Sequence, residues 1–167
     1  MPWHISALAA HHDRQAFDCG EPALNAFLQK LARQQADRDF SRSYVAIDGD
    51  APRIGGFYAI SAGVIEFEHG PAHLKLPRYP IPVARIGRLA VDLRDQGTGV
   101  GADLLRHALR HAVGLADKIG LHAVVVDAKD AQAAAFYARY GFKRLQDDGL
   151  TLFMPMALLR LAVPPVN

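Results

Sequence analysis

A glycine-rich stretch, Gln96-Gly97-Thr98-Gly99-Val100-Gly101, has the residue types of a phosphate-binding turn. Glycines at alternate positions remove side chains from the backbone path, so successive N–H groups can point at one anion. An apolar pattern of helical spacing begins at Val100, and the positive end of that helix dipole would face the same point. In physical terms, the stretch is a cradle for a pyrophosphate group.

Two well-known phosphate-binding loops do not fit this stretch. A nucleoside-triphosphate loop requires Gly-Lys-Ser/Thr before its helix, whereas Gly101 is followed by Ala102 and Asp103. The dinucleotide pattern G-x-G-x-x-G requires a different spacing of the third glycine. A tight strand-to-helix connection without a ligand is the alternative that the glycines alone leave open.

Other reactive side chains form weaker patterns. His107 and His111 are four residues apart and could share one helix face like a pair of metal ligands, but no third ligand accompanies them. We therefore expect solvent-facing histidines and no metal site. Cys19 stands beside Gly20 in a turn, and nothing in the sequence marks its thiol as activated.

The elements around the glycine-rich stretch determine its setting. Residues 84–91 are predicted to form a strand, and an amphipathic helix is predicted from Val100 to about Ile119, before Gly120. Residues 123–126 form a short apolar run typical of a strand that is buried on both faces. Strand, helix and strand together predict a β-α-β unit, with the glycines at its first turn.

The rest of the chain supplies further helices and strands. They are a helix from Pro22 to about Asp37, strands over 43–47 and 54–62, a short helix near 72–76, a helix over 131–140, and strands over 142–145 and 150–156. The first two strands flank a turn and predict an antiparallel hairpin. This order predicts an α+β, or mixed α/β, fold and excludes a sandwich or a bundle.

Length and composition define the class of protein. The chain has 167 residues, which predicts a single domain over 1–167 with a frayed tail at 163–167. Half of the residues are hydrophobic and 22% are charged, as in globular proteins, and the net charge of +2 demands no particular partner. No apolar run reaches the roughly 20 residues that cross a bilayer. No signal-peptide pattern begins the chain and only one cysteine is present, so a cytoplasmic location is expected.

Two motifs in this order resemble those of a known superfamily. Gln96-x-x-Gly99-x-Gly101 resembles the Q/R-x-x-G-x-G/A signature with which GNAT N-acetyltransferases wrap the pyrophosphate of coenzyme A, and Arg88-Leu89-Ala90-Val91-Asp92 looks like the preceding family strand. Phe136-Tyr137-Ala138-Arg139-Tyr140-Gly141-Phe142 is similar to the family element F-Y-x-x-x-G-F. The resemblance implies a GNAT-like central mixed β-sheet flanked by helices, with a β-α-β acetyl-CoA-binding core.

A narrower resemblance covers most of the chain. Phe17-Asp18-Cys19-Gly20 with Leu24-Asn25-Ala26-Phe27-Leu28, and residues 58–63 and 76–83, look like segments of GNAT toxins from bacterial toxin–antitoxin pairs. Such toxins acetylate the amino group of an aminoacyl-tRNA, and their partner is usually a ribbon-helix-helix antitoxin. The resemblance implies acetyl-CoA as donor, an aminoacyl-tRNA as acceptor, inhibition of translation, such an antitoxin as partner and, since many superfamily members are dimers, a possible homodimer.

The resemblance also assigns roles to single residues. The implied cofactor-binding residues are Leu89, Ala90, Val91, Gln96, Gly97, Thr98, Gly99, Val100, Gly101 and Phe136. Backbone groups of residues 89–91 would pair with the pantetheine arm, and a backbone N–H there, most plausibly that of Val91, would face the thioester oxygen. Tyr137 is the expected general acid, because a phenol with a pKa near 10 is protonated at neutral pH and can give its proton to a thiolate whose parent pKa is about 8.5.

No carboxylate in the sequence can be assigned as the general base. Asp130 occupies a position where many superfamily members have an Asn that touches pantetheine, but an ionised Asp cannot donate a hydrogen bond, so we expect Asp130 to cap the helix that begins near Ala131. Glu66 and Glu68 could act as a base or could be exposed strand-end charges. The lack of an evident base fits an α-amine, which has a pKa near 7.7–8.0 and is partly neutral already.

The basic residues do not decide which molecule accepts the acetyl group. Three sets could hold tRNA phosphates or could be solvated surface charge: Arg33, Arg38 and Arg42; Arg78, Arg85 and Arg88; and Arg139, Lys143 and Arg144. An acetyltransferase for a small-molecule or protein amine is one alternative function. A non-catalytic acyl-CoA-binding or antitoxin-binding module is a second.

Overall fold

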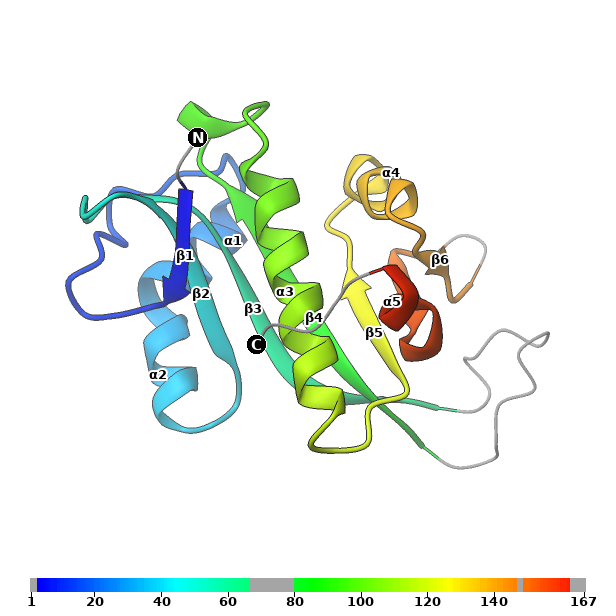
Figure 1. Cartoon of the computed structure of the whole chain (residues 1–167). Coiled ribbons are helices and arrows are strands. Elements are labelled where there is room, and N and C mark those ends of the chain that lie inside the picture. The colour runs from blue at the N-terminus through cyan, green and yellow to red at the C-terminus, as the bar shows by residue number, and fades with distance from the viewer. Residues whose placement is uncertain (1–2, 67–79, 147–148, 163–167) are drawn as a thin grey trace. The chain divides into compact units, whose positions relative to one another are not determined.

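The computed structural model describes residues 3–66, 80–146 and 149–162 (Figure 1). Its elements are β1 (Trp3–Ala7), α1 (Pro22–Ala26), the π-helical turn η1 (Phe27–Leu31), α2 (Ala32–Asp37), β2 (Arg42–Asp48), β3 (Ile54–Ile65), β4 (Ile81–Val91), the 3-10 turn η4 (Leu93–Asp95), α3 (Val100–Ala116), β5 (Ala123–Asp127), α4 (Ala131–Arg139), β6 (Lys143–Arg144), β7 (Thr151–Pro155) and α5 (Met156–Ala162). The short helix expected near 72–76, Glu68, Arg78 and the tail 163–167 lie outside the described residues.

The strands form a seven-stranded mixed sheet in the order β1-β2-β3-β4-β5-β7-β6. The β1–β2, β2–β3, β5–β7 and β6–β7 pairs are antiparallel, whereas β4 and β5 are parallel. The parallel pair enclosing α3 confirms the predicted β-α-β unit, and the β2–β3 pair confirms the predicted hairpin. The predicted mixed α/β fold class is therefore confirmed.

The chain forms two compact units. Met1–Ser61 and Arg88–Ala108 make up the first, and Ala62–Gly87 and Leu109–Asn167 make up the second. β3, β4 and α3 each contribute residues to both units. The prediction of a single domain over 1–167 stays a prediction.

In the first unit, the buried face of the N-terminal helical segment shifts at a π-helical turn. Phe27 and Leu28 are buried as the spacing predicts, but Leu31, expected on the same face, is 43% exposed. The π-helical turn Phe27–Leu31 inserts one extra residue, which rotates the following turn and buries Ala32 instead. Phe27, Leu28 and Ala32 join the first unit's core together with the strand residues Val45, Ile54 and Phe57.

The opposite face of β3 in this unit receives the first half of α3. A Cβ atom at Gly56 would lie 2.8 Å from Leu104 Cδ1 and 2.9 Å from the Ala90 carbonyl oxygen. Glycine therefore lets α3 and β4 approach β3 closely. This close approach fixes the N-terminal half of α3 beside the strand that leads into the glycine-rich turn.

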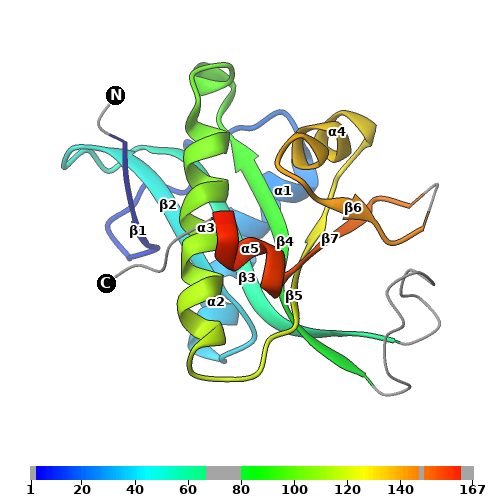
Figure 2. The same ribbon diagram turned by 45° about the vertical axis from the view of Figure 1, so that its right-hand side comes forward.

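The second unit has its own core around β5. Residues 123–126 are at most 1% exposed, as expected for a strand buried on both faces. Ile65, Val83, Val125 and Phe153 belong to one cluster of buried side chains in this unit. In Figure 2, β7 lies next to β5, and the C-terminal helix α5 continues directly from β7.

Several elements differ from the sequence prediction. β1 and α5 were not predicted, and the strand expected over 150–156 ends at Pro155 because Met156 begins α5. β4 begins at Ile81 instead of 84 despite its second residue, Pro82, whose side chain is exposed and whose carbonyl accepts a hydrogen bond from His122 N (2.8 Å). Within the described part of the chain, no helix has the length and apolarity needed to span a membrane.

Candidate active site

The glycine-rich turn has the backbone geometry that the sequence predicts. Gly97 and Gly99 adopt φ angles of +80° and +93°, a region that other residues rarely occupy. A Cβ atom at either position would meet nothing within 4 Å, so backbone conformation, and not lack of space, calls for glycine. Residues 96–99 are exposed, and the turn leads directly into α3 at Val100.

The first turn of α3 supplies amide donors at this point. Asp103 N donates to the Gly99 carbonyl oxygen (3.1 Å), the first bond of the helix ladder. The N–H groups of Val100, Gly101 and Ala102 precede that bond, and helix geometry directs them out of the N-terminus. Together with the positive end of the helix dipole, they form a place for an anion. Thr98 does not add its hydroxyl to this place, because Oγ1 donates to the Asp95 carbonyl oxygen.

Gln96 braces the turn. Its Nε2 donates to the carbonyl oxygens of Val91 (3.0 Å) and Cys19 (3.2 Å). The side chain thus ties the turn both to the end of β4 and to the N-terminal segment. A cofactor contact from the Gln96 side chain stays a prediction, whereas its bracing contacts are visible.

The sequence analysis missed a buried carboxylate beside the turn. Asp92 is 1% exposed, and its two oxygens accept hydrogen bonds from Asp18 N (3.1 Å), Arg94 N (2.9 Å) and Arg94 Nε (2.9 Å). Burial opposes its ionisation, but the hydrogen bonds and charge of Arg94 and the bond from Asp18 outweigh burial and lower the pKa of Asp92 to about 2. Asp92 therefore stays ionised and joins two segments that are far apart in sequence.

A second ion pair holds the residue directly before the turn. Arg53 donates from both terminal nitrogens to Asp95, at 2.7 and 3.2 Å, and Asp95 is only 8% exposed. Asp95 closes η4, immediately before Gln96. Two buried carboxylates, Asp92 and Asp95, therefore anchor the segment that leads into the turn, so the start of the turn is fixed before any ligand arrives.

The last residues of β4 extend beyond its pairing with β5. Its register with β5 covers residues 83–86 and stops at Ile86–Val126, although β4 runs on to Val91. No described β5 residue is in register with positions 87–91. Backbone groups on this edge of Leu89, Ala90 and Val91 are suited to an extended, amide-containing ligand, as predicted from the resemblance. The Arg88 guanidinium lies 3.9 Å from the centre of the Phe27 ring, and phosphate binding by Arg88 stays a prediction.

Tyr137 is in the second unit, on α4. The helix begins as predicted, because Asp130 caps it by accepting a hydrogen bond from Ala133 N (2.8 Å). Tyr137 is 3% exposed and packs between the rings of Phe136 and Phe142, at centroid distances of 5.3 and 6.0 Å. Burial, followed by the negative charge of Asp127, raises the pKa of the Tyr137 phenol. The phenol therefore holds its proton throughout the physiological range.

Asp127 is another carboxylate that the sequence analysis missed. It ends β5, and both of its oxygens lie 2.7 Å from Arg85 Nη1 on β4, while Thr151 Oγ1 on β7 donates to Oδ1 (3.2 Å). Arg85, which the sequence placed in a phosphate-binding set, is thus already paired with a carboxylate. The one available signal was an Asp directly after a buried strand.

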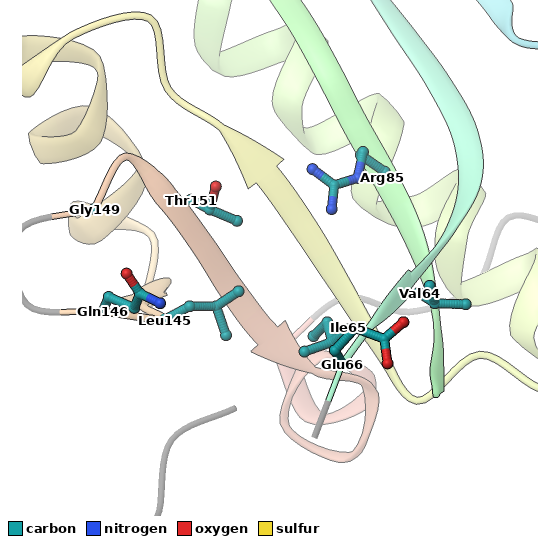
Figure 3. A pocket seen from close by; sticks show the side chains of 8 residues that line it. All are labelled: Val64, Ile65, Glu66, Arg85, Leu145, Gln146, Gly149 and Thr151. Atoms are coloured by element: carbon teal, nitrogen blue, oxygen red, sulfur yellow. The ribbon is translucent and has the colours of Figure 1, made fainter. Parts of the chain in front are cut away.

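Arg85 and Thr151 also line a cavity of about 250 Å³ in the second unit, shown in Figure 3. Its lining residues are Val64, Ile65, Glu66, Arg85, Leu145, Gln146, Gly149 and Thr151. Arg85 and Thr151 project from neighbouring parts of the sheet, and Glu66 follows the end of β3. This cavity holds an exposed carboxylate, Glu66, close to a paired guanidinium.

The two histidines and the cysteine considered in the sequence analysis are buried or half-buried. His107 is half-buried and its Nδ1 lies 2.7 Å from the Tyr58 hydroxyl, so the expectation of a solvent-facing side chain is wrong there. Burial lowers the pKa of His111, which is also half-buried. Cys19 is buried. Among the residues that the structure describes, no three His, Cys, Asp or Glu side chains are grouped as metal ligands.

Comparison with known proteins identifies the family of this chain. A family model described as an acetyltransferase (GNAT) domain matches residues 8–159. A protein named probable toxin TacT, from Sinorhizobium fredii, is 35% identical over 159 residues, which cover 89% of this chain and 88% of that protein. A tRNA-acetylating toxin from Mycobacterium tuberculosis is 38% identical over 147 residues, which cover 86% of each chain.

Solved structures agree with these relatives. A tyrosine-to-phenylalanine mutant of KacT superposes with a TM-score of 0.89 at 31% identity, covering 96% of this chain and 98% of that chain. AtaT complexed with acetyl-methionyl-tRNAfMet gives a TM-score of 0.86 at 30% identity, with the same coverage. A mutant AtaT toxin bound to the C-terminus of the antitoxin AtaR and acetyl-CoA gives 0.82 at 30% identity, covering 96% and 97%.

Proposed function

Because this chain belongs to the GNAT acetyltransferase family, we propose that it transfers the acetyl group of acetyl-CoA to the amino group of an aminoacyl-tRNA. The observation that carries the proposal is the glycine turn at the start of α3, braced by Asp92 and Asp95, in a chain similar over most of its length to a tRNA-acetylating toxin. Exposed amides at a helix N-terminus suit a diphosphate, and the unpaired end of β4 suits a pantetheine amide.

Most of the proposed donor contacts come from residues of the first unit. N–H groups at Gly97, Gly99 and the first turn of α3 would bind the diphosphate. Backbone groups of residues 89–91 would align the pantetheine arm. This positioning turns a bimolecular reaction into one between held groups, and such positioning supplies a large share of the rate in acyl transfer.

The chemical step would use a backbone N–H and a phenol. The amine nitrogen attacks the thioester carbonyl carbon, and the negative charge that forms on its oxygen would be stabilised by a backbone N–H such as that of Val91. The C–S bond then breaks as the carbonyl re-forms, and the thiolate would take the proton of Tyr137. The attacking nitrogen becomes an ammonium in the tetrahedral intermediate and loses one proton to water to give the neutral amide, and Tyr137 is reprotonated by solvent. Its raised pKa keeps the phenol protonated until the C–S bond breaks, while the same shift makes it a weaker acid toward the thiolate.

Phe136 is proposed as a cofactor contact beside Tyr137. The expected partners follow from the relatives, one of which is bound to an antitoxin C-terminus and to acetyl-CoA. A ribbon-helix-helix antitoxin and a homodimer are proposed for this chain. A cytoplasmic location, where charged tRNA is found, is part of the same proposal.

The test is acetylation of total charged tRNA with labelled acetyl-CoA, followed by identification of the modified species. We expect an acetyl mass increment on the amino acid and arrest of translation in vitro. Tyr137→Phe should lower kcat by 100-fold or more while leaving acetyl-CoA affinity within about twofold, because one general acid contributes about 10² to 10⁴ in rate. An unmodified tRNA pool together with acetylation of a free small amine would replace the proposal by the small-amine alternative.

A further inference from the structure

The cavity in the second unit has the composition of a side-chain pocket. Val64, Ile65 and Leu145 supply apolar wall, while Glu66, Gln146 and Thr151 supply polar groups (Figure 3). Its volume of about 250 Å³ exceeds the roughly 150 Å³ that accommodates a benzene molecule in an engineered cavity. A large amino-acid side chain would therefore fit.

The pocket is linked to Tyr137 by two routes. Arg85 and Thr151 line the pocket, and both donate hydrogen bonds to Asp127, whose negative charge acts on the Tyr137 phenol. Along the chain, Phe142 N donates to the Tyr137 carbonyl oxygen (3.4 Å), the two rings are 6.0 Å apart, and Leu145, three residues further on, lines the pocket. A substrate whose amine is brought to the acetyl-transfer chemistry near Tyr137 would accordingly have this pocket within reach of its side chain.

The pocket has an excess of negative charge. Arg85 contributes one positive charge, but Asp127 holds it with both oxygens at 2.7 Å, and that pair is neutral overall. Arg144 donates to the Gly149 carbonyl oxygen (2.9 Å), yet its side chain is not part of the lining. Glu66 is exposed and, among the described residues, forms no ion pair.

We propose that this pocket receives the side chain of the amino acid carried by the acceptor tRNA, and that Glu66 makes it discriminate against acidic side chains. The proposal rests on the proposed function and adds a specificity residue to it. Two like charges in a partly solvated pocket repel each other, whereas the same repulsion is absent for a neutral side chain of equal size. Glutamate and glutamine are such a pair, because they differ by one charge and have nearly the same shape.

The test uses one tRNA body charged chemically with glutamine or with glutamate. We expect the wild-type kcat/KM for acetylation to be at least tenfold higher with the glutaminyl form, a difference that corresponds to about 1.4 kcal/mol. Glu66→Gln should reduce this ratio to within about twofold of one, and Glu66→Lys should invert it. Asp117→Asn removes a carboxylate of the same unit that does not line the pocket, and it should keep the wild-type ratio.

The outcomes separate the two proposals. Acetylation of the glutaminyl form measures the proposed function, and the ratio between the two forms measures the specificity. A wild-type ratio near one, or a ratio that Glu66→Gln and Glu66→Lys leave unchanged, overturns the role of Glu66 while the acetylation reaction stands. Wild-type protein that acetylates total charged tRNA but neither of these two forms overturns the role of Glu66 while the proposed function stands, and protein that acetylates no charged tRNA overturns both proposals. An equal shift in Asp117→Asn would overturn the role of Glu66 by assigning the effect to the overall charge of the protein.

Discussion

Replacing Asp92 by Asn tests the idea that a buried carboxylate organises the donor-binding turn. Asn keeps the size of the side chain, but it removes the charge that Arg94 compensates and places an amide donor where two donors already point. The pKa of Asp92 is lowered from 3.8 to about 2, and each pKa unit corresponds to about 1.36 kcal/mol. We therefore expect Asp92→Asn to reduce the free energy of unfolding by about 2 kcal/mol at pH 7.

The pH dependence of that difference follows from the direction of the shift. A carboxyl whose pKa is lower in the folded state stabilises the fold when it is ionised, so its contribution is complete well above pH 3.8 and is lost as the pH falls towards 2. Urea unfolding of wild type and Asp92→Asn should consequently show a difference that shrinks to roughly half its neutral value near pH 3.

A matched surface carboxylate provides the control. Asp117 pairs with Arg160 at 2.7 Å, but both side chains are close to half exposed, so Asp117→Asn should cost at most about 0.5 kcal/mol. The reasoning would be refuted if the two variants lost equal stability, or if the Asp92→Asn difference stayed constant from pH 7 to pH 3. Calorimetric titration with acetyl-CoA should also show weaker binding by Asp92→Asn, because the turn loses its anchor to the segment at Asp18.

Two further substitutions probe the local geometry. Gly99→Ala forces a side chain into φ +93°, so it should cost about 1 to 3 kcal/mol in urea unfolding and weaken acetyl-CoA binding. As a control, Gly114→Ala, in the last turn of α3 with open space around it, should stabilise the protein by about 0.4 to 1 kcal/mol. Asp130→Ala removes the cap of α4 and should lower the unfolding free energy by about 1 kcal/mol, measured by thermal or urea unfolding, and an unchanged stability would contradict the capping role.

The sequence predicted the parts of the site that depend on local signals. Glycines at 97 and 99 require left-handed backbone angles, and the apolar spacing after Val100 requires a helix, so the turn and its helix were both identifiable. Asp130 was identified as a cap because the residue type and its position before a helix determine that contact. These features depend on residues within a few positions of one another.

Elements with weak local signals were missed. β1 has five residues without strict alternation, and it forms by pairing with β2 about 40 positions away. The seven residues of α5 continue an apolar run, and the change from strand to helix at Met156 is marked only by Pro155, which the predicted strand included. The π-helical turn at Phe27–Leu31 likewise shifts the buried face without any change in the apolar spacing.

Two of the missed carboxylates, Asp92 and Asp127, share a position in the fold. Asp92 follows Val91 at the end of β4, and Asp127 follows Val126 at the end of β5. The residues directly before each carboxylate are apolar, Leu89–Val91 on β4 and Ala123–Val126 on β5, so the carboxylate lies where the strand end and its connecting loop meet. What the sequence lacks is the partner, because Asp92 binds a residue 74 positions away and Asp127 one 42 positions away.

An Asp that follows an apolar residue at the end of a strand does not always anchor a distant segment, as Ile47-Asp48 shows. Asp48 also follows a buried residue at the end of a strand, but it is exposed in the turn of the hairpin. A turn between adjacent antiparallel strands leaves its residues facing solvent, whereas β4 and β5 end beneath crossover connections that bring distant segments over them. The topology, and not the residue pair, therefore decides which carboxylate becomes an anchor. For the same reason, Asp92→Asn should destabilise the protein far more than Asp48→Asn.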